Sequence, residues 1–283
     1  MMRQTDPTQT LDGESFRTIA ALAYRESGLT LVEEKAIMIQ SRLRHRLRAL
    51  GIGDFAQYTA FLTSEEGQPE RRELICALTT NVSHFYREKH HFEMMCEVVQ
   101  SRLSALQAGD RVRIWSAGCS NGQESLSAAL FLLERFPCIG EFDLRILGTD
   151  IDRQVIRFAR AGTYSEKMIE GLPQDVRQRH FTPRRSAKGD LAFQARPDVM
   201  RLIRYNELNI LGDWPMRNAF DIIFCRNVVI YFDLMTQARL WPRFRDALRP
   251  GGLLFLGHSE RITDPARVGF DIAGATAYRP LMS

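Results

Sequence analysis

The spacing of apolar residues changes near residue 110, and this change divides the chain. Over residues 15–80 apolar side chains recur every three or four positions, which predicts a small all-α domain of amphipathic helices. Gly28 and Gly51 fall where such helices would end, because glycine readily adopts the left-handed conformation of a C-cap. Residues 1–14 are polar and predict a flexible tail, and residues 64–72 predict a charged loop.

The helix predicted to end at Leu50 combines an apolar face with an excess of basic side chains. Its apolar face carries Ile39, Leu43 and Leu47 at helical spacing. Basic residues flank that face: Lys35, Arg42, Arg44, Arg46 and Arg48. One interpretation is a solvated surface whose arginine stems cover the edge of the core, and the other is a docking surface for an acidic partner.

Residues 81–108 predict a linker and a connecting helix, and an α/β domain is expected over residues 109–283. Strand-like runs alternate there with helical patterns, at residues 111–117, 144–150, 200–205, 220–226 and 252–258. This alternation is typical of a mostly parallel sheet with helices on both faces. A long connection between the second and third runs contains a hairpin pattern around Lys188 to Asp190, which predicts a small β-insert at about residues 176–197.

The first predicted strand runs into a turn that contains Gly118, and Glu124 opens the next helix. A turn of small residues lets the backbone approach a ligand closely, and the helix N-terminus offers free N–H groups. The second strand ends at Asp150, where a carboxylate can accept hydrogen bonds from both ribose hydroxyls. The glycines lack the spacing of a dinucleotide fingerprint, so the pattern favours S-adenosylmethionine. Arg226 and Asn227 end the fourth strand, at the edge where open α/β sheets bind ligands.

Composition narrows the class of protein. A net charge of +4 is too small to indicate nucleic-acid binding unless it is clustered, and 45% hydrophobic residues are ordinary for a soluble globular protein. The five cysteines are scattered without paired spacing, which argues for a reducing compartment and against a structural zinc site. No apolar run is long enough to span a membrane, so we expect a cytoplasmic protein.

Motifs of one family occur in order in segments 78–88, 115–124, 148–152, 208–211, 220–233 and 252–260. Together they closely resemble the CheR family of chemotaxis receptor methyltransferases. The resemblance runs from about residue 15 to about residue 280. It implies a Rossmann-like S-adenosylmethionine methyltransferase sheet with a small β-insert, preceded by a small all-α N-terminal domain.

The resemblance implies transfer of a methyl group from S-adenosylmethionine to glutamate side chains in the cytoplasmic helical bundle of methyl-accepting chemoreceptors. With the turn glycine and the strand-end arginine added, the expected cofactor contacts are Asn81, Ser83, Arg87, Gly118, Glu124, Asp150, Asn209, Ile210, Arg226 and Asn227. The basic helix becomes the expected docking surface for the receptor, through Lys35, Arg42, Arg46 and Arg48.

Methyl transfer to a carboxylate requires alignment more than a base, because a glutamate side chain is ionised at neutral pH. Arg87 is the candidate that steers the substrate carboxylate, and Tyr231 is the candidate that orients its second oxygen. The alternatives are that Arg87 only closes over the cofactor and that Tyr231 is a packed aromatic at the rim. No metal is expected.

The expected partner is the receptor bundle, bound by a monomer without nucleic acid or membrane insertion. Some relatives hold a receptor C-terminal pentapeptide through a glycine-rich turn, whereas this insert offers only Gly189, so we expect independence from that tether. Two other functions stay open. One is an S-adenosylmethionine enzyme acting on nucleic acid or a small molecule, which would need a catalytic loop with an aromatic residue and a proline, or a long basic groove, after the fourth strand. The other is a non-catalytic adaptor, against which the presence of both Arg87 and Tyr231 argues.

Overall fold

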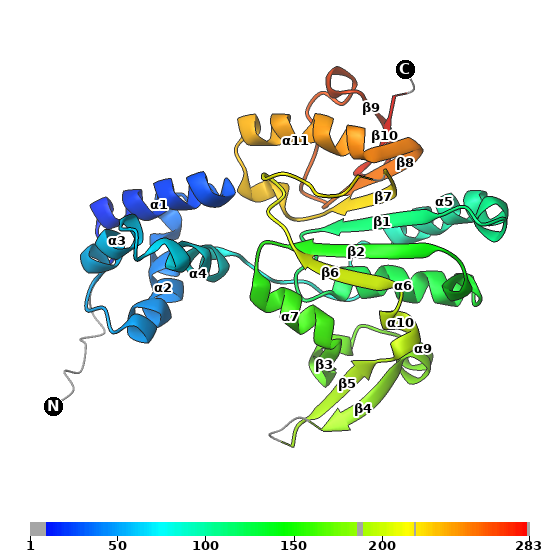
Figure 1. Ribbon diagram of the computed structural model, residues 1–283, viewed down its shortest axis with the longest axis horizontal. Helices are drawn as coiled ribbons and strands as arrows, with labels where there is room; N and C mark the ends of the chain where they lie inside the picture. Colours follow the sequence, from blue (N-terminus) through cyan, green and yellow to red (C-terminus); the bar gives the residue numbers. More distant parts are fainter. Residues whose placement is uncertain (1–9, 186–188, 218, 282–283) are drawn as a thin grey trace. The chain divides into compact units, whose positions relative to one another are not determined.

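The computed structural model describes residues 10–185, 189–217 and 219–281 (Figure 1). By their internal contacts these residues form two compact units. The first, called the helical unit, extends to Thr80 and includes Tyr231–Asp233, and the rest of the described chain forms the second, called the sheet unit. Residues 1–9 of the expected tail and residues 186–188 of the expected hairpin lie outside the described residues.

The helical unit is built from α1 (Gly13–Ser27), η1 (Glu33–Lys35), α2 (Ala36–Leu50), α3 (Phe55–Thr63) and α4 (Gln68–Leu78). Asp12 caps α1, because its carboxylate accepts hydrogen bonds from the N–H groups of Glu14 and Ser15 at 2.9 Å. Gly28 and Gly51 end α1 and α2 with φ angles of 70° and 69°, so the expected left-handed caps are confirmed. Fully buried side chains fill the core, among them Ile19, Ile39, Leu43, Tyr58, Leu62 and Leu74.

The prediction of a charged loop at residues 64–72 is wrong in its second half, because α4 begins at Gln68. Pro69 lies in the first turn of α4, where its missing N–H is not needed and its fixed φ suits a helix. Arg71 donates a hydrogen bond from Nε to the carbonyl oxygen of Leu62 in α3, at 2.8 Å. This arginine therefore joins α4 to α3 instead of facing solvent from a loop.

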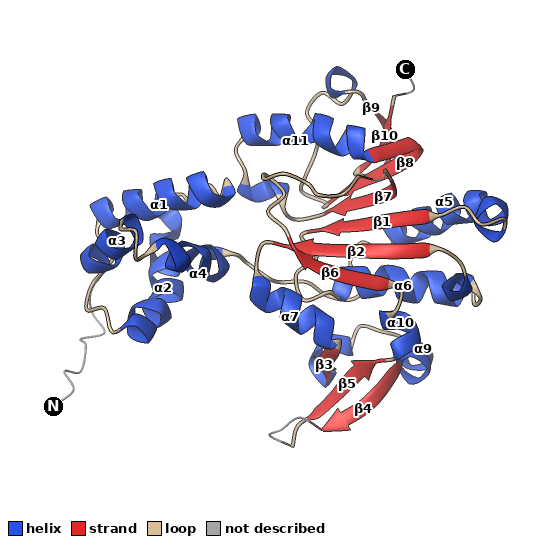
Figure 2. Cartoon of the chain, in the orientation of Figure 1, coloured by secondary structure: helices blue, strands red, loops and turns tan. Residues whose placement is uncertain are grey.

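The sheet unit contains, within the described residues, a seven-stranded sheet in the order β6-β2-β1-β7-β8-β10-β9 (Figure 2). Its strands are β1 (Val112–Ala117), β2 (Leu144–Asp150), β6 (Ile203–Glu207), β7 (Phe220–Cys225), β8 (Leu248–Leu256), β9 (Phe270–Gly274) and β10 (Ala277–Pro280). The pairings from β6 to β8 are parallel, which confirms the mostly parallel sheet. β10 and β9 extend it with antiparallel pairings and are additions to the expected strands.

Helices cover both faces of this sheet: α5 (His90–Gln107), α6 (Gln123–Arg135), α7 (Arg153–Ala161) and α11 (Leu234–Ala247). Trp115 of β1 packs against Phe244 of α11, with ring centroids 5.7 Å apart. Phe224 of β7 packs against Phe92 of α5 at 5.5 Å. Because Phe224 is in register with Ser116, it points to the face opposite Trp115. The two helices therefore lie on opposite faces, as the alternation of strands and helices predicts.

A smaller antiparallel sheet has the order β3 (Thr163–Ser165), β5 (Leu191–Ala195) and β4 (Phe181–Arg185). β4 and β5 pair as the expected hairpin, whereas β3 is an additional strand that comes before the predicted insert. The remaining short helices are α8 (Glu166–Ile169), α9 (Gln174–His180), α10 (Pro197–Met200), η2 (Ile139–Glu141), η3 (Val229–Tyr231) and η4 (Ala266–Val268).

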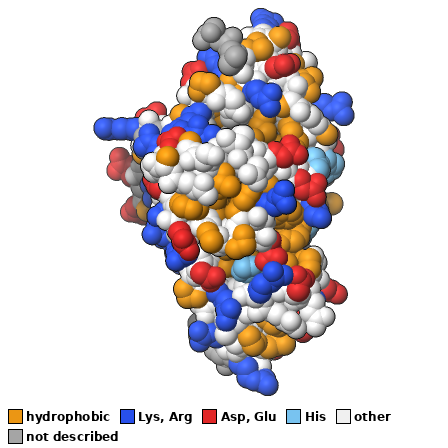
Figure 3. All heavy atoms as spheres, turned by 90° about the vertical axis from the view of Figure 1, so that its right-hand side faces the viewer, with side chains coloured by type: hydrophobic (Ala, Val, Ile, Leu, Met, Phe, Trp, Pro, Cys, Tyr) orange, Lys and Arg blue, Asp and Glu red, His pale blue; other side chains and the backbone are white. Residues whose placement is uncertain are grey.

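None of the helices in the described parts of the chain is long and apolar enough to cross a membrane. On the face drawn in Figure 3, basic and acidic side chains are intermingled. This distribution agrees with the small net charge of +4.

Candidate functional site

The carboxyl ends of β6, β2, β1 and β7 lie next to one another, because these strands are parallel neighbours. This edge of the sheet is called the cofactor edge below. The expected cofactor contacts lie at or after these ends: Asn209 and Ile210 after β6, Asp150 on β2, Gly118 and Glu124 after β1, and Asn227 after β7. The fold thus gathers residues that are far apart in the sequence, in the place where open α/β sheets bind ligands.

The turn after β1 packs tightly against its surroundings. Gly118 has a φ of 88°, and a Cβ atom there would lie 2.3 Å from Cγ2 of Val228. Its N–H donates a hydrogen bond to the carbonyl oxygen of Thr149 at 2.8 Å. On the other side of the turn, the hydroxyl of Tyr164 donates to the carbonyl oxygen of Asn121 at 2.7 Å. Glycine is therefore required at residue 118 both for its conformation and for the close approach.

Asp150 shapes this turn through its carboxylate. Oδ2 accepts a hydrogen bond from the N–H of Ser120 at 2.9 Å, and Oδ1 accepts one from the N–H of Asp152 at 3.0 Å. Burial raises the pKa of Asp150 to about 6, although the two N–H donors favour the ionised form. Each carboxylate oxygen keeps a further lone pair, so the pair can also accept hydrogen bonds from a ligand.

Ser120 adds a polar atom that sequence reasoning did not single out. Within residues 10–185, 189–217 and 219–281, its buried Oγ atom has no hydrogen-bond partner. Buried hydroxyls are nearly always bonded in folded proteins, so this position fits a polar ligand. With the Asp150 carboxylate and the N-terminal N–H groups of α6, the donor and acceptor set suits the ribose and amino-acid parts of S-adenosylmethionine.

The segment that follows the helical unit reaches the same edge. Nδ2 of Asn81 donates a hydrogen bond to Oδ2 of Asp152 at 2.8 Å, and Asp152 in turn caps α7 by accepting from the N–H of Gln154 at 2.7 Å. Ser83 lies half-buried in the same segment. Asn81 is therefore tied to the loop that follows β2.

Glu124 and Arg226 form a buried ion pair at the cofactor edge. Oε1 of Glu124 accepts a hydrogen bond from the hydroxyl of Ser116 at 2.7 Å, and Oε2 accepts one from Nη1 of Arg226 at 3.1 Å. Burial raises the pKa of Glu124, and the Arg226 guanidinium opposes that rise. The Arg226 side chain is 2% exposed, and its Nη2 donates to the carbonyl oxygen of Arg87 at 2.5 Å. Arg226 therefore joins the cofactor edge to the backbone of Arg87.

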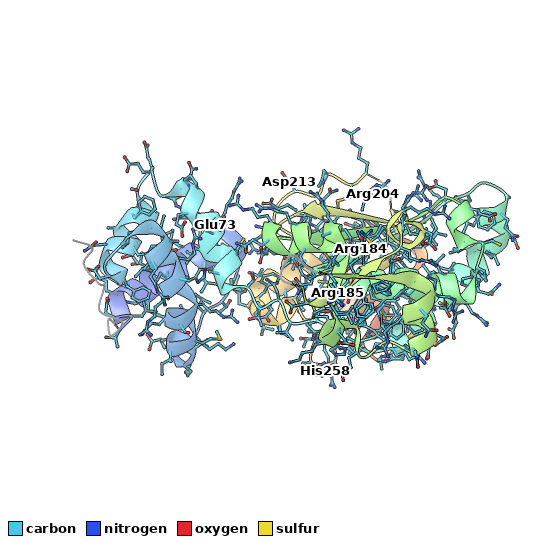
Figure 4. All side chains as sticks on the ribbon, turned by 90° about the horizontal axis from the view of Figure 1, so that it is seen from below. Glu73, Arg184, Arg185, Arg204, Asp213 and His258 are labelled. Atoms are coloured by element: carbon cyan, nitrogen blue, oxygen red, sulfur yellow. The ribbon has the colours of Figure 1, made fainter. Side chains whose placement is uncertain are left out.

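Glu88 brings a second carboxylate to Arg226. Its Oε2 lies 3.3 Å from Nη2 of Arg226, and its Oε1 lies 3.3 Å from Nδ1 of His258, an exposed residue that Figure 4 labels. Burial disfavours the ionised form, but Arg226 and the N–H of His258 outweigh it and hold the pKa of Glu88 below its usual value. A charged Glu88 thus helps to balance the buried guanidinium.

The backbone around Arg87 is strained. Tyr86 and Glu88, on either side of it, have φ angles of 58° and 52°, in the left-handed region that favours glycine. Such conformations cost about 1–3 kcal/mol each and concentrate at functional sites. The N–H of Tyr86 donates to the hydroxyl of Ser127 at 3.0 Å, which helps to hold the turn. Ser120 in the turn after β1 is also left-handed, with a φ of 49°.

The guanidinium of Arg87 makes only long contacts within the described residues. Its Nη1 lies 3.4 Å from the carbonyl oxygen of Val82, and its Nε lies 3.9 Å from the carboxylate of Glu88. The side chain is 26% exposed. The strained turn therefore fixes the backbone of Arg87 while leaving most of its donors available to a ligand.

The loop after β6 is held from α11. Nη1 of Arg243 donates to the carbonyl oxygen of Ile210 at 3.0 Å, and its guanidinium carbon lies 4.3 Å from the ring centroid of Trp214. The Trp214 indole also donates to the Ile210 carbonyl oxygen, at 2.9 Å. Oδ1 of Asn209 accepts a hydrogen bond from the N–H of Leu211 at 3.0 Å. The expected contacts Asn209 and Ile210 thus belong to an ordered loop.

Tyr231 ends η3 and belongs by its contacts to the helical unit. Within that unit its carbonyl oxygen accepts a hydrogen bond from the N–H of Thr30 at 2.9 Å. Its pairing with Arg87 on a substrate carboxylate stays a prediction.

Arg46 on the basic helix α2 has partners inside the helical unit. Its guanidinium donates to both carboxylate oxygens of Glu70, at 2.8 and 2.5 Å, and lies 3.6 Å from Glu73, which Figure 4 labels. The Tyr58 hydroxyl donates to the same Glu70 at 2.9 Å, and burial raises the pKa of Tyr58. Arg46 therefore neutralises a buried carboxylate.

Arg42 also serves the helical unit. Its Nη1 donates to the carbonyl oxygens of Leu78 and Thr79 at 2.7 and 3.0 Å, where α4 ends. Lys35 and Arg48, the other expected docking residues, are exposed. The structure thus divides the four expected docking residues into two arginines with internal partners and two exposed cations.

Sequence reasoning missed the residues that hold the loops of the site in place: Glu88, Ser120, Asp152, Arg243 and Glu260. Their partners are distant in sequence, so spacing alone carries no signal for them. The available signal for Glu260 is weak: it is a carboxylate four positions after the end of the apolar strand β8. Glu260 accepts main-chain hydrogen bonds from the loop after β7.

Comparison with known proteins gives matches over both units. Residues 14–79 match the family described as "CheR methyltransferase, all-alpha domain", and residues 81–278 match "CheR methyltransferase, SAM binding domain". The chain is 44% identical over 259 residues to the "Probable chemotaxis protein methyltransferase" of Rhizobium etli, covering 91% of this chain and 96% of that one. It is 38% identical over 272 residues to "Chemotaxis protein methyltransferase 2" of Pseudomonas aeruginosa, covering 94% and 93%. Identity to the "Chemotaxis protein methyltransferase" of Escherichia coli is 35% over 270 residues, covering 95% and 91%.

Proposed function

The chain belongs to the CheR methyltransferase family, as its motifs indicate, and from this premise we propose that it methylates glutamate side chains in the cytoplasmic helices of chemoreceptors. It is a methyltransferase of chemotaxis with an S-adenosylmethionine-binding domain. The proposed product is a glutamate methyl ester that serves sensory adaptation, formed in the cytoplasm by a monomer. The observation that carries this proposal is the strained turn that holds Arg87 against the Glu124–Arg226 pair.

We assign the cofactor to the cofactor edge, with contacts from Asn81, Ser83, Gly118, Glu124, Asp150, Asn209, Ile210 and Asn227. When bound there, S-adenosylmethionine supplies an electrophilic methyl group on a sulfonium sulfur. Asp150 accepts hydrogen bonds from the ribose hydroxyls, and Ser120 gains the partner that its buried hydroxyl needs. The guanidinium of Arg226 already donates hydrogen bonds to Glu124 and to the carbonyl oxygen of Arg87. We therefore expect Arg226 to support cofactor binding indirectly, by positioning these two residues.

The chemistry requires little of the protein except alignment. A glutamate side chain has an ordinary pKa of about 4.3, so the acceptor oxygen is ionised at neutral pH and needs no general base. That oxygen forms a bond to the methyl carbon as the carbon–sulfur bond breaks, which gives a methyl ester and S-adenosylhomocysteine without transfer of a proton. In this proposal Arg87 holds the acceptor carboxylate in line by charge-assisted hydrogen bonds, and Tyr231 orients the second oxygen.

Receptor docking is assigned to the basic helix α2. Methylated receptor helices carry acidic side chains, so exposed cations on α2 offer charge complementarity. Arg48 on α2 and Lys35, the last residue of η1 directly before α2, are exposed, and we expect them to make the greater contribution to docking. Arg42 and Arg46 belong to the same proposed surface, but their internal partners give them a structural task as well.

We also propose that docking does not depend on a C-terminal pentapeptide of the receptor. The support is the composition of the insert, where Gly189 has a φ of 86° but its neighbour Asp190 carries a side chain. Side chains at this turn hinder the approach of a peptide to the strand edge. A receptor truncated by its last five residues is expected to be labelled as fast as the full-length receptor, and a loss of about tenfold or more would contradict this.

The test of the proposed function is transfer of radiolabelled methyl groups from S-adenosylmethionine to membranes that carry chemoreceptors. We expect label on the receptors that mild base releases, as a methyl ester requires. Base-stable label, or cofactor binding without any labelling, would overturn the glutamate ester proposal in favour of another acceptor or an adaptor.

Arg87→Ala separates the two roles considered for this residue. If Arg87 steers the substrate, kcat/KM falls about a hundredfold while affinity for S-adenosylhomocysteine changes little, because misplacement of a reacting group has effects of this size. If Arg87 closes over the cofactor, that affinity falls as well. Arg267→Ala, which removes an exposed arginine from η4, is the control and should leave both quantities unchanged.

A further inference from the structure

Glu260 collects main-chain N–H groups from the loop after β7. Its Oε1 accepts hydrogen bonds from Val228 at 2.8 Å and from Ile230 at 3.1 Å. Its Oε2 accepts hydrogen bonds from Asn227 at 2.7 Å and from Gly257 at 2.6 Å. The residue is 3% exposed. A single buried carboxylate thus supplies the acceptors for most of the loop that leads from β7 to Tyr231.

This loop needs an external acceptor because it is neither strand nor helix at its start. Asn227 is a non-glycine residue with a φ of 59°, a conformation that is normally kept only where the surroundings impose it. Unpaired buried N–H groups are costly, and hydrogen bonds to a charged acceptor are about twice as strong as neutral ones. Glu260 therefore compensates for the strain at Asn227.

Gly257, directly after β8, approaches the same loop closely enough to exclude a side chain. A Cβ atom on Gly257 would lie 2.5 Å from Nδ2 of Asn227 and 2.8 Å from its main-chain nitrogen. The conformation of Asn227 is thus defined from two sides, by the carboxylate of Glu260 and by the bare backbone of Gly257. Neither residue is among the expected cofactor or substrate contacts.

We propose that Glu260 is a positioning residue for methyl transfer, which fixes the loop at residues 227–230 so that the Asn227 amide faces the cofactor edge. The proposal rests on the assignment of Asn227 as a cofactor contact in the proposed function. It extends to Tyr231, because the N–H of Ile230, the residue directly before Tyr231, is one of the four that Glu260 accepts.

Glu260→Gln tests this role with almost no change of size. Each carboxylate oxygen accepts two N–H groups, so either orientation of the glutamine amide points its NH₂ group at two donors. The loop cannot keep its present conformation with two such contacts. Gly257→Ala is the second variant, because it displaces Asn227 while leaving the carboxylate intact.

The matched control is Asp221→Asn. Asp221 is also a buried carboxylate on β7, it is 3% exposed, and it accepts the N–H of Arg113 at 2.8 Å. It lies at the amino end of the strand, opposite the loop. Asp221 also lies 3.6 Å from Nε of Arg102 and 3.9 Å from Nη1 of Arg249, so loss of its charge destabilises the fold away from the loop. A loss of affinity that comes from general destabilisation should therefore appear in the control as well, whereas loss of loop geometry should affect only Glu260→Gln.

The experiment is calorimetric titration of each full-length variant with S-adenosylhomocysteine, at a temperature well below its unfolding midpoint. For a positioning role, Glu260→Gln and Gly257→Ala weaken Kd about tenfold or more with a stoichiometry near one, and Asp221→Asn keeps the parent Kd. An unchanged Kd, or a reduced stoichiometry at unchanged Kd, would overturn the proposal, because it means that Glu260 only maintains the folded fraction. The titration needs no receptor, so its result is independent of whether glutamate is the acceptor.

Discussion

Nη2 of Arg226 donates a hydrogen bond of 2.5 Å to the carbonyl oxygen of Arg87, and this bond joins the end of β7 to the strained turn between Tyr86 and Glu88. The same guanidinium donates to Glu124 at the cofactor edge. One buried group thus contacts both the proposed cofactor side and the backbone of the proposed substrate-binding arginine. The Glu124–Arg226 pair therefore fixes the main chain at Arg87, whereas the side chain of Arg87 makes only long contacts.

Arg226→Lys should therefore lower kcat/KM for methyl transfer by about 10- to 100-fold. A lysine ammonium is a compact donor that cannot reach Glu124, Glu88 and the Arg87 carbonyl at the same time, whereas the guanidinium contacts all three. Steady-state kinetics with receptor membranes measure the effect. Arg113→Lys, at a surface pair with Asp143, is the control, and equal losses in both variants would contradict this prediction.

Tyr164→Phe should weaken cofactor binding several-fold, although Tyr164 lies in the small sheet. Its hydroxyl is the donor to the carbonyl oxygen of Asn121, so its loss leaves the turn after β1 less well held. We expect the free energy of unfolding to fall by about 1 kcal/mol, the usual contribution of one hydrogen bond. Thermal unfolding and titration with S-adenosylhomocysteine measure the two effects.

Tyr278→Phe provides the comparison for Tyr164→Phe. The Tyr278 hydroxyl accepts a hydrogen bond from the N–H of Ile262 at 3.2 Å, in a buried position on β10. The variant should lose a similar amount of stability without a change in cofactor affinity. If affinity follows stability in both variants, Tyr164 has no specific role at the turn.

Cofactor affinity should fall as the pH drops through about 6, because burial raises the pKa of Asp150 to about 6 from its ordinary 3.8. The ionised carboxylate accepts the hydrogen bonds of both ribose hydroxyls, and the protonated form does not. Below that pKa the affinity should decrease by up to about tenfold per pH unit. The measurement is the Kd of S-adenosylhomocysteine over the range from about pH 5 to pH 8. Asp150→Asn should bind more weakly with a flatter profile, and an unchanged slope would contradict the assignment.

The contribution of Asp150 to stability should depend on pH in the opposite direction to cofactor affinity. A carboxyl group whose pKa is raised on folding contributes stability that is fully present below its unfolded pKa, near 3.8, and is lost as the pH rises through about 6. The ionised form of Asp150, present at neutral pH, therefore lowers the stability of the fold relative to the protonated form. Replacement by asparagine removes the buried charge but points its NH₂ group at one of the two N–H donors, so it should not recover this stability, while cofactor binding still weakens.

The strand, turn and helix around Gly118 could be predicted from the sequence because their determinants are local. An apolar run, a small-residue turn and a helical pattern follow one another within residues 112–135, and the structure has β1 and α6 there. The positions of Asp150 and Asn227 at strand ends follow from similar local patterns. Parallel pairing then brings the ends of these strands to one edge.

Features that depend on distant partners could not be predicted in this way. Arg46 is one of several basic residues on α2, and only the fold shows that Glu70, 24 positions away, is its partner. The first residues of α4, from Gln68, are mostly polar or charged, which is why the sequence predicts a loop there. Glu260 likewise acquires its role from N–H groups more than 30 positions earlier in the chain, so no spacing rule identifies it.

Variants of the two classes of cation on α2 should separate docking from stability. Arg48→Glu reverses an exposed charge, so KM for receptor membranes should rise several-fold, and this effect should shrink as salt is added. The free energy of unfolding should fall by only about 0.3–1 kcal/mol, because the new anion lies in the last turn of α2. Arg46→Ala instead leaves Glu70 buried without its cation, which should lower the free energy of unfolding by about 3–5 kcal/mol.

Arg17→Glu, which reverses an exposed charge on α1, is the control for the electrostatic effect. If docking depends on α2, this variant should leave KM for the receptor near the parent value at every salt concentration. An equal rise in KM for Arg17→Glu and Arg48→Glu would show that the receptor responds to the total charge of the helical unit. In that case α2 would be one part of a diffuse basic surface rather than the docking site.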